Sequence, residues 1–79
     1  MIRLIKLKSS WRTSEINGRY QNEWSTIELA AEYLEKTTSI KSDTIDKALC
    51  EMYANKLCCA EFSNEGELKE VNNFNTLDT

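Results

Sequence analysis

Acidic side chains at helical spacing are the residues of this chain best suited to recognition chemistry. Glu28, Glu32 and Glu35 recur at steps of four and three residues. A helix would place their carboxylates on one face, with rises of about 6 and 4.5 Å between them. Such a row can attract a basic protein surface, whereas the alternative for any single glutamate is an ordinary solvated helix face. Four further acids can extend the row: Asp43, Asp46, Glu65 and Glu67.

A second candidate surface is basic and aromatic and lies near the N-terminus. Residues 1–24 carry five basic and two acidic side chains, whereas residues 25–71 carry five lysines and ten acids. Basic charges interleaved with aromatic rings are typical of proteins that bind single-stranded nucleic acid. The residues in question are Lys6, Lys8, Trp11, Arg12, Arg19 and Tyr20. The alternative is that the charges keep a strand soluble while the rings cover the core.

Catalysis is disfavoured by what the chain lacks. It contains no histidine, which excludes Ser-His and Cys-His activation of a nucleophile within this chain. Neither a phosphate-binding glycine motif nor a metal-ligand cluster is present in the sequence. We therefore expect no enzyme activity, no cofactor and no metal. Three cysteines without framework spacing are expected to be thiols, with Cys50 and Cys58 packed and Cys59 exposed.

These candidate residues depend on two predicted helices. The first covers residues 25–37, with a capping box formed by Ser25 and Glu28. The second runs from Ser42 to about residue 56, with Ser42 and Asp43 as capping residues. Each has an apolar stripe at helical spacing. The stripe residues are Ile27, Ala30, Ala31 and Leu34 in the first helix and Ile45, Ala48, Leu49, Met52 and Tyr53 in the second.

Strands are predicted on both sides of the helices. Residues 57–62 and 68–71 form a hairpin around a turn at 64–66, because Gly66 can adopt positive φ. Residues 2–8 form a strand that is apolar on both faces, which is usual for a central strand or one with a bulge. Asn17-Gly18 indicates a hairpin within residues 9–24, with a loop as the alternative.

The predicted architecture is a small single α+β domain. An antiparallel sheet carries two helices packed on one face, in the order β-(ββ)-α-α-β-β. The domain spans 1–71, and 72–79 is expected to be a frayed tail. No apolar run approaches the length of a membrane span, and charges interrupt the apolar N-terminal stretch. We therefore expect a cytoplasmic protein with no membrane partner.

The helix-helix-hairpin order of residues 26–71 resembles a winged-helix DNA-binding module. In that resemblance, Ser42-Asp43-Thr44-Ile45 begins the recognition helix and residues 63–67 form the wing. The resemblance implies DNA binding. Both segments are acidic here, however, whereas phosphate neutralisation supplies most non-specific DNA affinity.

The sequence therefore favours a non-enzymatic intracellular protein-binding module. Its partner would be a protein with a basic surface, occluded by the acidic helix face. Small acidic inhibitors from phages or mobile elements, anti-CRISPR proteins among them, offer an analogy based on size and charge. The alternative is a nucleic-acid-binding protein that uses a winged-helix-like element or the N-terminal patch. The sequence leaves the partner's identity and the oligomeric state open.

Overall fold

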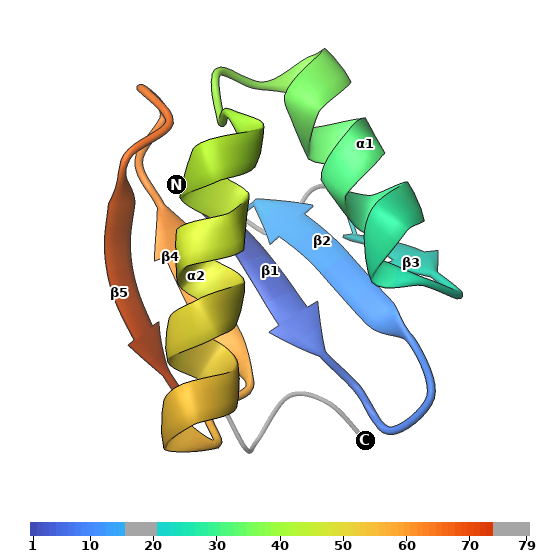
Figure 1. Cartoon of the computed structure of the whole chain (residues 1–79). Coiled ribbons are helices and arrows are strands. Elements are labelled where there is room, and N and C mark those ends of the chain that lie inside the picture. The colour runs from blue at the N-terminus through green and yellow to red at the C-terminus, as the bar shows by residue number, and fades with distance from the viewer. Residues whose placement is uncertain (16–20, 74–79) are drawn as a thin grey trace.

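The computed structural model describes residues 1–15 and 21–73 of the chain. This part contains a five-stranded antiparallel sheet with two helices on one face (Figure 1). The elements are β1 (Ile2–Lys6), β2 (Trp11–Glu15), β3 (Gln21–Trp24), α1 (Ile27–Thr37), α2 (Ser42–Asn55), β4 (Cys59–Phe62) and β5 (Leu68–Asn72). The predicted fold class and element order are confirmed. The strands predicted at 2–8 and 57–62 are shorter than expected, and the one predicted at 68–71 extends by one residue.

β1 is the central strand of the sheet. The strand order is β3-β2-β1-β4-β5, and every neighbouring pair is antiparallel. Ile2 and Leu4 join the core under the helices. Because side chains alternate along a strand, Ile5 lies on the opposite face, where it is also buried. The apolar residues on both faces of β1 therefore follow from its central position.

β2 and β3 confirm the hairpin interpretation of residues 9–24. They pair with Trp11 opposite Trp24. The Trp24 indole N–H donates a hydrogen bond to the Thr13 hydroxyl at 2.9 Å, and its ring packs against Tyr33 with the ring centroids 5.0 Å apart. These aromatic side chains close one side of the core. The turn predicted at Asn17-Gly18 lies outside the described residues.

The capping residue of α1 is Thr26. Its hydroxyl accepts a hydrogen bond from the Leu29 N–H. The prediction of Ser25 as the cap was wrong by one residue. Both residues carry a hydroxyl group, and spacing alone favoured Ser25 because Glu28 follows three positions later.

Replacing Thr26 with alanine is expected to cost about 1 kcal/mol of unfolding free energy, because a helix-terminal N–H loses its acceptor. Ser25→Ala is the matched control and should change stability by less than about 0.5 kcal/mol, as exposed substitutions usually do. Urea unfolding followed by circular dichroism measures both values. A larger effect at Ser25 than at Thr26 would contradict the assignment of the cap.

α2 begins as predicted at Ser42, but neither Ser42 nor Asp43 caps it. Lys41 occupies the N-cap position, and no side chain bonds the free N–H groups there. The helix ends at Asn55, and Lys56 follows in the left-handed conformation with φ 56°. The Lys56 N–H bonds the Met52 carbonyl, so a lysine ends this helix where glycine is the usual residue.

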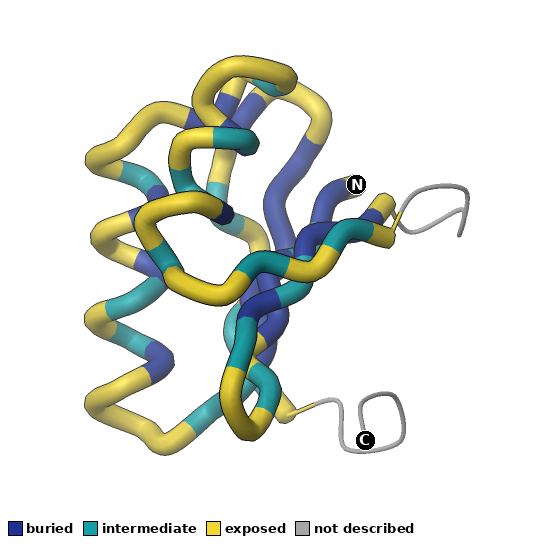
Figure 2. The backbone as a smooth tube through the Cα atoms, turned by 90° about the vertical axis from the view of Figure 1, so that its right-hand side faces the viewer, coloured by how far each residue is buried: buried dark blue, intermediate teal, exposed yellow. Residues whose placement is uncertain are grey.

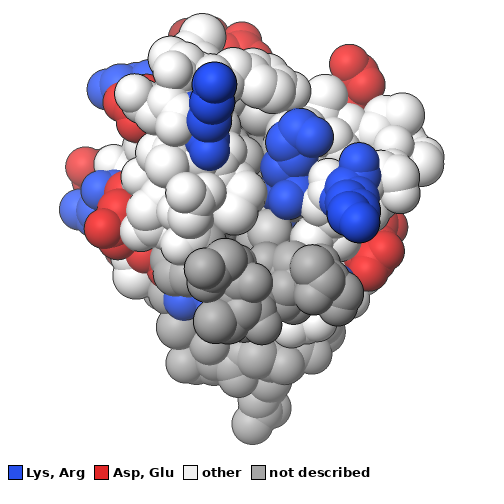
Figure 3. Space-filling view, turned by 90° about the horizontal axis from the view of Figure 1, so that it is seen from below, with Lys and Arg blue, Asp and Glu red and all other residues white. Residues whose placement is uncertain are grey.

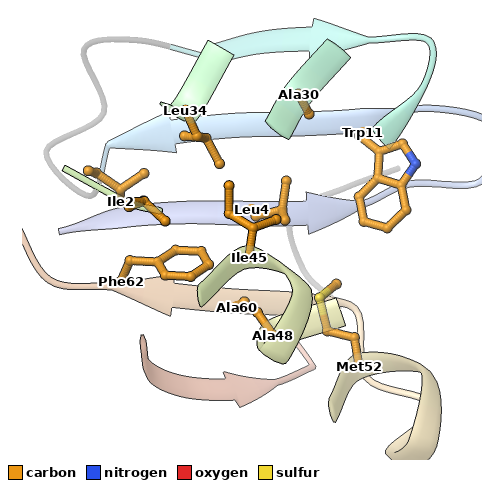
Figure 4. Close-up of a cluster of buried hydrophobic side chains, with 11 residues drawn as sticks. Ile2, Leu4, Trp11, Ala30, Leu34, Ile45, Ala48, Met52, Ala60 and Phe62 are labelled. Atoms are coloured by element: carbon orange, nitrogen blue, oxygen red, sulfur yellow. The ribbon is translucent and has the colours of Figure 1, made fainter. Parts of the chain in front are cut away.

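The core lies between the helix layer and the sheet (Figure 2). Figure 4 shows the helix residues Leu34 and Ile45 pointing toward β1 and β2, with Phe62 of β4 packed beside Ile2. Both helices therefore bury an apolar stripe against the sheet, as their spacing predicted, and their outer faces remain exposed. The buried cluster comprises Ile2, Leu4, Trp11, Ala30, Leu34, Ile40, Ile45, Ala48, Met52, Ala60 and Phe62.

The turn between β4 and β5 packs directly against the connector between the helices. Gly66 has φ 90°, and a Cβ atom built there would lie 2.4 Å from the Ser39 carbonyl oxygen. The Gly66 N–H bonds the Ser63 carbonyl at 2.9 Å. Gly66 is thus required for its positive φ, as predicted, and also for a close backbone approach that the sequence does not indicate.

Candidate partner-binding surfaces

The acidic row predicted on the first helix is formed by α1. Glu28, Glu32 and Glu35 are all exposed, because they lie opposite the buried residues Ala30 and Leu34. Glu32 also pairs with Lys36 one turn later, at 3.4 Å, and both side chains are well exposed. An exposed ion pair of this kind contributes little to stability in water. Glu32 can therefore leave Lys36 and pair with a basic residue of a partner.

The remaining four predicted acids gather at one end of the helix layer. Asp43 and Asp46 are exposed in the first turns of α2. Glu65 and Glu67 flank Gly66, whose contact with Ser39 holds this turn against the connector. The α1 row runs toward the same connector.

The acidic surface therefore consists of the predicted seven residues: Glu28, Glu32, Glu35, Asp43, Asp46, Glu65 and Glu67. It also contains positive charge, because the exposed lysines of the same elements are Lys36, Lys41 and Lys47. Acids outnumber bases on this surface, so its net charge remains negative. Steering of a basic partner needs only such an excess.

The residues of the predicted N-terminal patch do not share one surface environment. Trp11 is only 8% exposed and belongs to the core, so its ring is not available for base stacking. The Arg12 guanidinium forms an ion pair with the Glu23 carboxylate at 3.1 Å. Lys6 and Lys8 are exposed, and the Lys6 ammonium lies 5.8 Å from the centre of the Trp11 ring. Arg19 and Tyr20 lie outside the described residues.

Two exposed residues, Tyr53 in α2 and Lys56 directly after it, were not singled out as candidates from the sequence. Tyr53 was placed in the buried stripe but is 57% exposed, because it lies at the outer margin of that stripe. Lys56 lies two residues before Cys58, whose carbonyl accepts a hydrogen bond from the Lys6 N–H at 2.8 Å, so the backbone at Lys56 runs near the end of β1. Only the pairing of β1 with β4 reveals this proximity.

A cavity of about 140 Å³ lies between α1 and the strands β2 and β3. Several of the polar side chains that line the cavity already form hydrogen bonds within the protein. Asn22 donates a hydrogen bond to the Tyr33 hydroxyl at 3.3 Å, and the Thr38 hydroxyl bonds the Leu34 carbonyl. The described part of its wall therefore resembles a packing defect between helix and sheet more than a ligand site. The described lining residues are Ile2, Thr13, Ser14, Glu15, Asn22, Tyr33, Leu34, Thr37 and Thr38.

The three cysteines are free thiols, but their expected environments were partly wrong. Cys59 is fully buried on β4 instead of exposed, and Cys50 is exposed on α2 instead of packed. Cys58 is half-buried. Cys50 lies on the outer face of α2, away from the stripe of Ala48 and Met52.

Among the described residues, no group of histidine, cysteine and acidic side chains could hold a metal ion. Neither helix of this part is long and apolar enough to cross a membrane. Comparison with protein-family models, with curated proteins and with solved structures finds no match to this chain. The functional argument therefore rests on the two charged surfaces themselves.

Proposed function

We propose that this chain is a non-enzymatic protein-binding module whose acidic surface occludes a basic surface of a protein partner. The observation that carries the proposal is that the connector joins the end of the α1 row to further exposed acids. The α1 row leads to the connector, where the first turns of α2 and the β4–β5 turn add four more carboxylates. All of these elements pack on one core, so the backbone positions that carry these carboxylates are fixed relative to one another.

The fold makes little use of these carboxylates. Glu28 and Glu35 have no ion pair with another described residue, and Glu32 has only its exposed partner Lys36. Exposed charges of this kind contribute little to stability. They remain available for a partner, and their negative field would repel nucleic acid from this face.

The expected mode of binding is electrostatic steering followed by close contact. Acidic side chains accelerate the encounter with a basic patch, and this acceleration falls as salt screens the charges. Tyr53, exposed on the neighbouring helix, is the type of residue that often anchors an interface. A groove that normally holds nucleic acid would offer the required basic surface.

The biological class that fits this mode is a small inhibitor of a host protein. Inhibitors from phages and mobile elements, including anti-CRISPR proteins, have this size and acidic character. This part of the proposal rests on size and charge alone. The compartment implied is the cytoplasm of the host cell.

Reversing three charges tests the proposal. The variant Glu28→Lys, Glu32→Lys, Glu35→Lys should no longer capture the protein that the wild type captures from a lysate of the source organism. It should remain folded with a slightly lower melting temperature, because all three side chains are exposed but the change removes the first-turn acid of α1 and the Glu32–Lys36 pair. The control variant Glu15→Lys, Glu70→Lys reverses exposed acids on the strands and should capture normally. Equal capture by all three proteins would refute the proposal for this face.

A further inference from the structure

The end of the domain where β1 and α2 finish carries three lysines from separate parts of the chain. Lys6 ends β1, and Lys8 is exposed two residues later, before β2. Lys56 follows α2 and lies two residues before Cys58, whose carbonyl bonds the Lys6 N–H. We refer to Lys6, Lys8 and Lys56 as the lysine end.

None of the three lysines is paired with a carboxylate in the described part of the chain. Figure 3 shows this end of the molecule, where several basic side chains lie across the upper middle of the view and the acidic side chains lie toward the margins, together with further basic ones. The acids of the acidic surface lie mostly on the other end of the helix layer. The acidic surface, which also contains Lys36, Lys41 and Lys47, and the lysine end therefore lie toward different ends of the helix layer.

We infer that the lysine end binds the phosphate backbone of nucleic acid without reading its bases. Lysine ammonium groups bind phosphates as point charges. The ring that the structure places beside Lys6, that of Trp11, is buried beneath the Lys6 ammonium and cannot stack on a base. Stacking on aromatic rings supplies much of single-strand affinity, so contact limited to phosphates predicts weak, salt-dependent binding without sequence preference.

This site would act independently of the acidic surface. A partner that itself holds nucleic acid would present both a basic surface and phosphates. The domain could then contact the protein with one end and the nucleic acid with the other. The inference does not need such a partner, because phosphate binding can be measured on the isolated chain.

The test is fluorescence anisotropy with a labelled 20-base-pair duplex and a labelled 20-nucleotide strand, between 20 and 200 mM NaCl. Three phosphate contacts predict a slope of log affinity against log salt of about −2.7 for the duplex and about −2.1 for the single strand. Affinity should therefore fall roughly 40-fold for the duplex and 20-fold for the strand between 50 and 200 mM NaCl.

The variant Lys6→Gln, Lys8→Gln, Lys56→Gly should lose this salt-dependent binding. Glycine suits the left-handed conformation of residue 56, so Lys56→Gly alone should melt at or above the wild-type temperature. That single variant should also make the duplex slope less negative by about 0.9. A changed slope without a lower melting temperature would show that the lost charge, and not unfolding, weakens the binding. Lys47→Gln, on the outer face of α2, is the matched control and should bind like the wild type.

Two kinds of result would overturn the inference, the first of which can take either of two forms. One is wild-type affinity in the triple variant, or no binding of the wild type at 20 mM NaCl. The other is binding of a poly-glutamate peptide of matched charge when the oligonucleotides do not bind, which would assign the lysine end to an acidic protein. Neither result bears on the acidic surface, so the proposed function would stand or fall separately.

Discussion

Phe62→Ala is expected to lower the unfolding free energy by about 3–5 kcal/mol, the usual cost of removing a buried phenylalanine ring. Phe62 is fully buried on β4 and packs among Ile2 and other core residues beneath the helices. A chain of 79 residues typically has about 4–12 kcal/mol of stability in total. The substitution should therefore leave the domain marginally folded or unfolded at 37 °C.

Urea and thermal unfolding followed by circular dichroism measure this effect. Tyr53→Ala is the matched control, because it also removes an aromatic ring, but from a side chain that is 57% exposed. The control should change the unfolding free energy by less than about 0.5 kcal/mol. Similar losses in the two variants would show that the core is not arranged around Phe62.

Gly66→Ala is expected to cost about 2–5 kcal/mol, because two penalties combine. The added Cβ would meet the Ser39 carbonyl oxygen at 2.4 Å, and alanine is strained at φ 90°. The turn would have to move away from the helix connector, which would also displace Glu65 and Glu67. The expected result is a lower melting temperature together with weaker partner binding.

A second substitution separates the two causes. Asparagine tolerates positive φ better than alanine, but it has the same Cβ. Gly66→Asn should therefore remain destabilised if the close approach to Ser39 dominates. Near-complete recovery of stability in Gly66→Asn would show that only the backbone conformation matters.

The main elements could be predicted because their signals are local. The stripe of Ile45, Ala48 and Met52 identified α2, and the apolar residues on both faces of residues 2–8 indicated a strand that is either central or bulged. The caps were less predictable. Ser25 and Thr26 differ by one position, and the backbone geometry that selects Thr26 is not visible in the sequence.

The candidate sites were predictable only where they lie on one element. Helical spacing was enough to place Glu28, Glu32 and Glu35 together. Lys56 could not be assigned to the neighbourhood of Lys6, because 50 positions separate them and the register of β1 with β4 brings them close. For the same reason, the sequence did not show that the turn around Gly66 meets Ser39.

The central claim is that the acidic surface binds a protein and the lysine end does not take part. Lysate, with and without nuclease treatment, should be passed over the tagged wild type, the Glu28→Lys, Glu32→Lys, Glu35→Lys variant, and the Lys6→Gln, Lys8→Gln, Lys56→Gly variant. The retained proteins are identified by mass spectrometry. We predict one dominant protein retained by the wild type and the lysine variant and lost from the glutamate variant. Retention by the glutamate variant, or loss of the captured protein on nuclease treatment, would contradict the claim.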